Sequence, residues 1–139
     1  MTNQIYPCLW FDNKAKEAAD YYCAIFKNSK VISENPMVVM FELNGEKFMG
    51  LNGGPMFKFN EAVSFVVTCE TQDEIDYYWS KLTAGGSEVQ CGWLKDKFGL
   101  SWQIVPARIS ELLKTSKAMQ AMMKMKKFDI AELERAAQA

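Results

Sequence analysis

The residue types that most often perform chemistry are sparse in this sequence, and one of them is missing. There is no histidine among the 139 residues. Imidazole is the usual general base near neutral pH, the usual activator of serine and cysteine nucleophiles, and a common ligand of zinc and iron. The composition therefore excludes Ser-His and Cys-His catalysis and every histidine-ligated metal centre.

Four cysteines are the next candidates, at Cys8, Cys23, Cys69 and Cys91. None of them forms a C-x-x-C pair, so their spacing argues against a zinc ribbon and against a thioredoxin-type redox motif. We expect them to be small, buried apolar residues in a reducing compartment. Cys8 is the best candidate for a nucleophilic thiol, but no cation stands near it in sequence to activate it.

Charged side chains are balanced, with 16 basic and 17 acidic residues. This balance gives no basic surface for nucleic acid or an anionic membrane, so we predict neither as a partner. The carboxylates do not cluster in sequence as metal ligands would. Asp96, between Lys95 and Lys97, is interpreted as a solvated charge of a hairpin turn.

Length and composition predict one domain, residues 1–139, because 49% of the residues are hydrophobic and can form a sizeable core. The apolar runs, such as Met37–Phe41, are too short to span a bilayer. The N-terminal stretch MTNQIYPCLWFD has no basic region followed by an apolar one, so we expect no export signal and a cytoplasmic location.

The same order of elements is predicted twice along the chain. The first copy has a strand at 5–11, a helix from the cap Asp12-Asn13 to about Phe26, and strands near 30–33, 37–43 and 47–51. Asn44-Gly45 is typical of a tight hairpin between the last two strands. The second copy has a strand at 61–69, a helix from the capping box Thr71–Glu74 to Gly85-Gly86, and strands near 88–91, 93–97 and 100–105.

Residue matches support a duplication. Asp20-Tyr21-Tyr22 recurs as Asp76-Tyr77-Tyr78, and the same offset of 56 (76 minus 20) aligns Cys8 with Ser64. Near the ends of the copies, an offset of 54 aligns Gly45 with Gly99 (99 minus 45) and Phe48 with Trp102. We predict an α+β fold of paired βαβββ repeats that form a cupped mixed sheet, with repeat one at 3–55, repeat two at 60–106 and a C-terminal helical tail at 107–139.

The tail contains helical stripes, the stretch MQAMMKMKK, and a second capped helix start at Asp129 and Glu132. Its methionines and lysines are typical either of a partner-binding or membrane-surface helix, or of a helix whose methionines cover the core while its lysines face water. We favour the second interpretation.

Three stretches, LWFDNKAKEAADYY, KFMGLNGGPMFKFNEAVSFVV and CGWLKDKFGLSWQIVP, and the tail segment MMKMKKFDIAELERA closely resemble the PhnB-like branch of the vicinal oxygen chelate superfamily. This superfamily includes glyoxalase I, bleomycin-resistance proteins and extradiol dioxygenases, and the branch is often labelled 3-demethylubiquinone 3-methyltransferase. The resemblance implies that each repeat curls its strands into half of a cup that holds a ligand, and that the protein forms a homodimer. Relatives carry a longer hairpin where only Ser33–Pro36 stands here; if that hairpin is a lid over the cup in the relatives, the lid is lost in this sequence.

Metal-dependent members of the superfamily have ligands on the first and last strand of each repeat. The resemblance transfers these positions to, or near, Cys8, Met49, Ser64 and Gln103. A thiol, a thioether, a hydroxyl and an amide do not suit a hard or borderline divalent ion, so we predict no metal. Isolated glycine pairs that are explained by turns offer no nucleotide-binding loop, so we predict no cofactor and doubt the methyltransferase label.

Alternation along 62–68 predicts that Ser64, Val66 and Thr68 point into the cup, while Val63, Phe65 and Val67 lie under a helix. The repeat offset extends this pattern to the first strand, with Ile5, Leu9 and Phe11 on its helix side. The predicted cup-lining residues are Tyr6, Cys8, Trp10, Met49, Leu51, Ser64, Val66, Trp93 and Gln103.

These residues predict a metal-free protein that binds a small, planar organic molecule in an apolar aromatic cup, with Ser64 and Gln103 as polar contacts. Two alternatives stay open. A metal-independent enzyme would need a carboxylate or a perturbed cysteine or tyrosine as its base. A protein that acts through dimerisation or a partner would use the same aromatic residues as core or interface.

Overall fold

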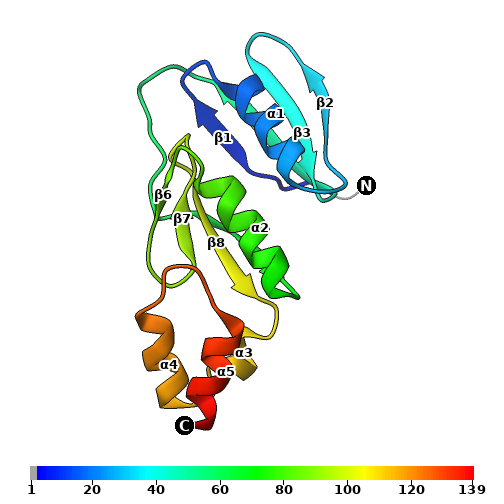
Figure 1. Cartoon of the computed structure of the whole chain (residues 1–139). Helices are drawn as coiled ribbons and strands as arrows, with labels where there is room; N and C mark the ends of the chain where they lie inside the picture. Colours follow the sequence, from blue (N-terminus) through cyan, green and yellow to red (C-terminus); the bar gives the residue numbers. More distant parts are fainter. Residues whose placement is uncertain (1–2) are drawn as a thin grey trace. The chain divides into compact units, whose positions relative to one another are not determined.

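The structure is a computed structural model that describes residues 3–139. The chain divides into two compact units, Met1–Lys58 and Phe59–Ala139. Each unit contains one four-stranded mixed sheet with a helix on one face, and the second also carries the C-terminal helices (Figure 1). The predicted α+β class and the twofold βαβββ order are confirmed. None of the helices within residues 3–139 has the length and apolar composition needed to span a bilayer.

The first unit has a sheet in the order β1-β4-β3-β2, in which β1 runs parallel to β4 and the other pairs are antiparallel. Helix α1 packs on this sheet through its buried stripe. Its elements are β1 (Cys8–Phe11), α1 (Ala15–Ile25), β2 (Lys30–Glu34), β3 (Val38–Leu43) and β4 (Glu46–Asn52).

Alternation decides which residues form the core of this unit. Leu9 and Phe11 of β1 are buried towards α1, as predicted, together with Phe41 and Phe48, whose rings stack with centroids 5.5 Å apart. Gly50 allows α1 to lie close to β4, because a Cβ at this position would lie only 3.2 Å from the Cβ of Ala15. The prediction for Ile5 is wrong: β1 begins three residues later, and Ile5 is 97% exposed.

The N-terminal cap of α1 is also corrected by the structure. Asp12-Asn13 does not cap the helix. The N-cap residue is Lys14, and its side chain makes no capping hydrogen bond. Instead Asn52, at the end of β4, accepts a 2.9 Å hydrogen bond from the backbone N–H of Ala15. The predicted Asn44-Gly45 turn is confirmed, with positive φ angles of 51° and 83°.

The second unit repeats the arrangement in the order β5-β8-β7-β6, with β5 parallel to β8. The capping box of Thr71 and Glu74 at the start of α2 is confirmed in both of its hydrogen bonds. The elements are β5 (Ser64–Cys69), α2 (Gln72–Thr83), β6 (Ser87–Glu88), β7 (Trp93–Lys95), β8 (Ser101–Pro106), α3 (Ile109–Leu112), α4 (Ser116–Met123) and α5 (Ile130–Gln138).

Three sequence interpretations are wrong in this unit. Val63 precedes β5 and is 61% exposed, so it does not lie under α2. The predicted strand at 88–91 is wrong: β6 ends at Glu88, and a turn closed by the hydrogen bond from Trp93 N–H to the carbonyl of Gln90 follows, in which Cys91 has a positive φ of 58°. Asp96 is not solvated: it is 2% exposed, and its carboxylate accepts hydrogen bonds from three N–H groups of the β7–β8 hairpin.

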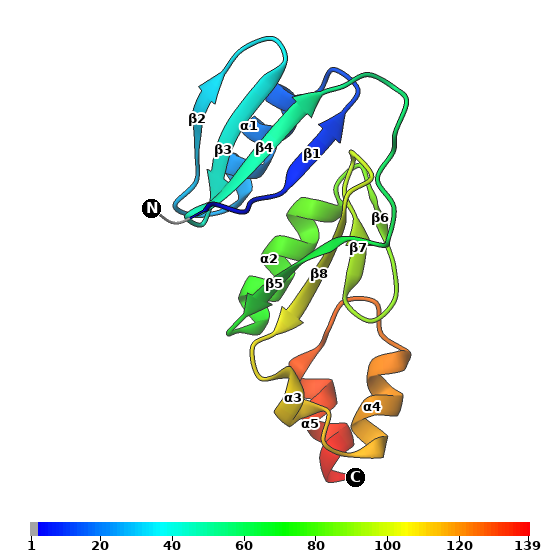
Figure 2. The same cartoon turned by 180° about the vertical axis from the view of Figure 1, so that it is seen from behind.

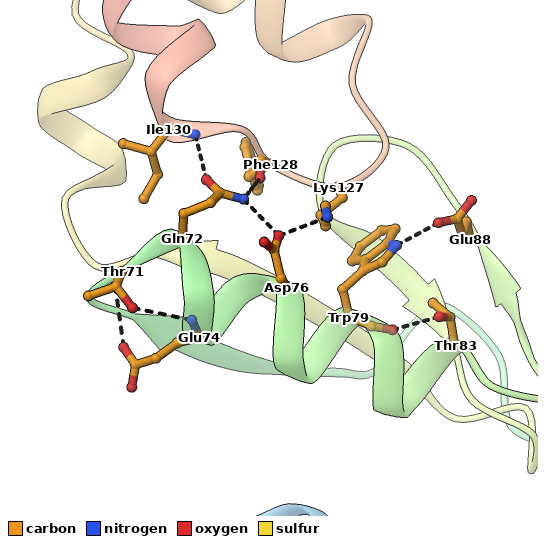
Figure 3. A network of polar contacts seen from close by, with 10 residues as sticks. All are labelled: Thr71, Gln72, Glu74, Asp76, Trp79, Thr83, Glu88, Lys127, Phe128 and Ile130. Carbon is orange, nitrogen blue, oxygen red and sulfur yellow. Dashed lines mark hydrogen bonds and ion pairs between the residues drawn. The ribbon is translucent and has the colours of Figure 1, made fainter.

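Within the second unit, a polar network connects α2 to the segment that leads into α5 (Figure 3). Gln72 of α2 donates to the carbonyl of Phe128 (2.9 Å) and accepts from the N–H of Ile130 (2.8 Å). Hydrogen bonds from Lys127 and Gln72 lower the pKa of Asp76 below its usual value. A carboxylate whose pKa is lower in the folded than in the unfolded state stabilises the folded protein at pH values above the unfolded-state pKa. This contribution is lost as the pH falls through the folded-state pKa.

Candidate ligand-binding faces

The first sheet leaves one face without a covering helix, which we call the first open face. Figure 2 shows this face, with β1, β4 and β3 in front of α1. Cross-strand pairs place the residues in rows across the three strands. One row is Cys8, Met49 and Met40, and the next is Trp10, Leu51 and Val38. Cys8 is exposed and the other five are half-buried, so this face is apolar and accessible.

Trp10 also has a structural task on the first open face. Its indole N–H donates to the carbonyl of Gly54 (2.9 Å), and its ring meets that of Phe57 edge to face at 4.9 Å. A Cβ at Gly53 would lie 2.3 Å from the indole, so only glycine fits there. The segment after β4 therefore covers part of Trp10. Tyr6 precedes β1, is half-buried, and lies under the ammonium of Lys47 at 5.1 Å.

The second sheet has a corresponding second open face, opposite α2. Its central row is Val66, Gln103 and Trp93, on the neighbouring strands β5, β8 and β7. Val66 is 55% exposed, while Gln103 and Trp93 are half-buried. The amide nitrogen of Gln103 donates a 2.9 Å hydrogen bond to the hydroxyl of Ser64. This face combines apolar surface with one amide–hydroxyl pair.

The four positions transferred from the superfamily meet two by two, each pair within its own unit. Cys8 and Met49 are directly opposed, whereas Ser64 is opposed to Ser101 and only reaches Gln103 on the diagonal. The pairing is nevertheless the same in both repeats, because Val66 is opposed to Gln103 as Cys8 is to Met49, and the N–H of Ala107 donates to Cys69 as that of Gly53 donates to Phe11. The structure therefore aligns Cys8 with Val66, and the predicted alignment of Cys8 with Ser64 is wrong by two residues. Sequence reasoning missed Met40, because its place beside Met49 depends on the pairing of β3 with β4.

Known proteins identify the family. The family model of 3-demethylubiquinone-9 3-methyltransferase matches residues 3–105. The putative 3-demethylubiquinone-9 3-methyltransferase, PhnB protein, from Bacillus cereus is 33% identical, with a TM-score of 0.69 over 76% of this chain and 100% of that one. The chain belongs to this PhnB-like family. A comparison with curated proteins finds no match.

More distant structures show that the PhnB-like chain shares the vicinal oxygen chelate fold. The fosfomycin resistance protein FosX from Listeria monocytogenes, complexed with Mn(II) and sulfate ion, is 16% identical, with a TM-score of 0.55 over 75% of this chain and 89% of that one. A glyoxalase/bleomycin resistance protein from Albidiferax ferrireducens is 11% identical, with a TM-score of 0.53 over 71% and 93% of the two chains. At these identities the likeness concerns the fold alone.

The donor atoms of this PhnB-like chain do not suit a divalent ion. Within residues 3–139, no three or more cysteine, aspartate or glutamate side chains gather where they could hold a metal. The Asp96 carboxylate is fully engaged by the backbone N–H groups of Phe98 and Leu100 and by the indole of Trp102. Neither open face therefore groups the several carboxylate, imidazole or thiolate ligands with which proteins hold manganese, iron or zinc.

Burial sets the reactivity of the cysteine thiols. Desolvation raises the pKa of Cys8 and Cys23, and it raises the pKa of Cys69 to about 11. The thiolate is the nucleophilic form, so these environments oppose activation rather than provide it.

We expect iodoacetamide at pH 8 to modify the exposed Cys8 first and Cys69 last in the native protein. A thiol of pKa about 11 is only about one-thousandth thiolate at this pH, and Cys69 is also buried. Mass spectrometry of tryptic peptides measures the rates, and unfolding in urea should make all four cysteines react alike. Native modification of Cys69 at the rate of Cys8 would contradict this order.

Proposed function

We propose that the chain is a small-molecule binding protein that acts without a divalent metal and takes a planar, largely apolar organic ligand on its open sheet faces. The observation that carries this proposal is the row Val66, Gln103 and Trp93, which presents an exposed aliphatic group, an amide and an indole side by side. Binding sites for small organic molecules combine mostly apolar walls with a few polar groups that fix orientation.

Each part of the second open face has a physical task in this proposal. Val66 and Trp93 lose apolar surface to water when a flat ring covers them, and each square ångström buried contributes about 25 cal/mol. Gln103 has both a donor and an acceptor, and its bond to Ser64 holds the amide in one orientation. A carbonyl or hydroxyl on the ligand would complete the hydrogen bonds of this pair.

The first open face supports a ligand of the same kind. Cys8, Met49 and Leu51 form accessible apolar surface next to Trp10. Methionine side chains are flexible and polarisable, so they adapt to aromatic ligands of different shape. We include in the proposal that the protein is a homodimer, because an accessible apolar sheet face is also a surface that a second copy can cover.

A metal-independent enzyme is less well supported by the same groups. Although Cys8 is exposed, partial desolvation raises the pKa of its thiol, which lowers the fraction of the nucleophilic thiolate at neutral pH. The Asp96 carboxylate is held away from water by three N–H donors and serves the hairpin, not a reaction. The small-molecule binding function therefore stands as the conclusion.

We expect aromatic ligands to raise the melting temperature of the full chain in a saturable manner. A panel of quinones, aromatic metabolites and aromatic antibiotics is screened by thermal shift, and hits are measured by titration calorimetry and assayed for turnover. Val66→Glu should weaken binding of a hit at least about tenfold, because it places a charge against an apolar ligand. Light scattering with and without the ligand gives the oligomeric state.

The matched control is Val63→Glu, since Val63 is as exposed as Val66 but lies outside β5. Val63→Glu should bind the hit as the unaltered protein does. Flat melting curves across the panel, or equal weakening in both variants, would overturn the proposal and favour a protein that works through a partner.

A further inference from the structure

Ser101 is a buried polar residue in the second sheet whose hydroxyl lacks a partner. It begins β8, the strand between β5 and β7, and is 1% exposed. Its hydroxyl oxygen has no hydrogen bond to any atom of residues 3–139. A buried hydroxyl without a partner is energetically unfavourable, and in native proteins such a group usually has one. The unpaired hydroxyl therefore points to a ligand atom that accepts a hydrogen bond from it.

Strand pairing places Ser101 directly between Ser64 of β5 and Lys95 of β7. Directly paired residues project from the same side of a sheet. Their neighbours along β7 and β8, Leu94 and Trp102, are paired with each other and buried on the side of α2. The row Ser64, Ser101 and Lys95 therefore lies on the second open face. It runs beside the row that carries the proposed function, two positions away along each strand.

The ammonium of Lys95 is paired with a carboxylate of the chain itself. Its Nζ lies 3.2 Å from a carboxylate oxygen of Glu61, in the turn that leads into β5. The ion pair thus joins the strands on either side of β8, near Ser101. The side chain of Glu61 is 63% exposed and that of Lys95 is 35% exposed. Because exposed ion pairs are weak, Glu61 can leave towards solvent while the ammonium stays at the sheet.

We infer that Ser64, Ser101 and Lys95 form a carboxylate subsite, which binds an acid group of the planar ligand and which Glu61 occupies until that ligand arrives. This inference rests on the proposed binding of a planar ligand to the second open face, and it names the ligand class as aromatic carboxylic acids. The ring covers the neighbouring apolar row, and the acid group takes the place of Glu61 beside the ammonium. One carboxylate replaces another, so the charge balance at Lys95 is unchanged.

The two hydroxyls give the ligand an advantage that Glu61 does not have. Ser101 gains the acceptor that it lacks in the ligand-free protein. The hydroxyl of Ser64 accepts a hydrogen bond from Gln103, so its own proton remains available to donate to a carboxylate oxygen. Hydrogen bonds to an ionised acceptor are stronger than those to a neutral one, so the subsite favours a carboxylate over an uncharged amide.

The test compares probes that share a ring and differ in charge, cinnamate with cinnamamide and salicylate with salicylamide. Titration calorimetry of the full chain measures their dissociation constants. We expect each carboxylate to bind about tenfold more tightly than its amide. Lys95→Met should abolish this preference by weakening the carboxylates alone, and Lys95→Arg, which keeps the charge, should retain it.

Glu61→Gln distinguishes a displaced carboxylate from one that only supports the fold. It should tighten carboxylate binding at least about threefold, because the internal competitor is gone, and should leave amide binding unchanged. Ser101→Ala should weaken the carboxylates about fivefold without lowering stability to urea, since its hydroxyl has no partner in the ligand-free protein. The control is Lys97→Met, which removes an exposed lysine of the same hairpin and should keep the preference.

Circular dichroism verifies that each variant is folded. Equal affinity for acid and amide, a preference that persists in Lys95→Met, or weaker carboxylate binding in Glu61→Gln would overturn the carboxylate subsite and leave the proposed binding of planar ligands standing. Failure of all four probes to bind would overturn both.

Discussion

Replacing Asp96 with alanine is expected to lower the free energy of unfolding by about 3–5 kcal/mol. One carboxylate oxygen accepts from the backbone N–H groups of Phe98 (2.9 Å) and Leu100 (3.1 Å), and the other accepts from the indole N–H of Trp102 (2.9 Å). Asp96 is only 2% exposed, so water cannot replace these bonds when the carboxylate is removed. Each orphaned buried donor costs about 1–3 kcal/mol.

Asparagine at position 96 separates the charge from the shape of this side chain. Its amide oxygen can still accept from the two backbone N–H groups, but its NH₂ group would face the indole N–H of Trp102. Asp96→Asn is therefore expected to cost about 2 kcal/mol, less than alanine. The double variant of Asp96→Asn with Trp102→Phe lacks the indole N–H that would face the asparagine NH₂ group. The losses in free energy of unfolding of the two single variants should therefore not add.

Urea unfolding followed by tryptophan fluorescence and circular dichroism measures these differences at constant m. Asp73→Asn, at an exposed position in the first turn of α2, is the control and should lie within about 0.5 kcal/mol of the unaltered protein. A loss below about 1 kcal/mol for Asp96→Ala would refute the role assigned to this carboxylate.

Much of the fold could be predicted because its determinants are local. The turn at Asn44-Gly45, the capping box at Thr71 and the N-cap at Asp129 depend on residues within three positions of each other, and the structure confirms them. The cap of α1 could not be predicted, because Asn52 reaches it from the end of β4. Asp96 was misread for the same reason: its neighbours Lys95 and Lys97 suggest solvent, whereas its burial depends on Trp102 across the hairpin.

The candidate faces were predictable only in part. Alternation along single strands correctly places Cys8 and Trp10 of β1 opposite the buried side chains of Leu9 and Phe11. It cannot give the register between strands, which decides that Cys8 meets Met49 directly. Alternation also misplaces the starts of β1 and β5. Where a strand begins depends on where its partner strand begins to pair with it, and a single strand's sequence does not contain this information.

The comparison of the two repeats shows what duplication does and does not preserve. Strand order and the helix position are common to both sheets. Register is common too, since Cys8 is opposed to Met49 as Val66 is opposed to Gln103. What differs is the side chains at equivalent positions: a thiol and a thioether on the first open face, an aliphatic group and an amide on the second. The same backbone pairing thus presents different chemical groups on the two faces.

Truncating Phe128 to alanine is expected to release the C-terminal helices while the sheet of the second unit stays folded. Phe128 is 3% exposed and packs directly on Gly92. Removing a buried phenylalanine ring costs about 3–5 kcal/mol, because the ring loses its contacts and leaves a cavity. Polar contacts add to this attachment, through Gln72, through the Lys127–Asp76 ion pair and through backbone bonds from Cys91 and Gly92 to the carbonyls of Met125 and Lys126 (Figure 3 shows the Gln72 and Lys127 contacts).

Gly92→Ala should release the same helices without any change to Phe128. A Cβ at position 92 would lie 2.4 Å from the Phe128 ring, and the φ angle of 83° is unfavourable for alanine. Gly99→Ala is the matched control: its φ angle is 88°, but nothing lies within 4 Å of the added Cβ. It therefore carries the backbone strain without the clash and should leave the helices docked.

Hydrogen exchange and limited trypsin digestion read out the release. Amides of α4 and α5 should lose protection in Phe128→Ala and Gly92→Ala, and trypsin should cleave both variants quickly after Lys124, Lys126 and Lys127. Amides of β5 and β8 should stay protected, since α2 covers their buried side independently of the tail. If β5 and β8 lost protection together with α5, the helices would be part of the cooperative core of the unit; if Gly99→Ala released them too, backbone strain and not the Phe128 contact would govern docking.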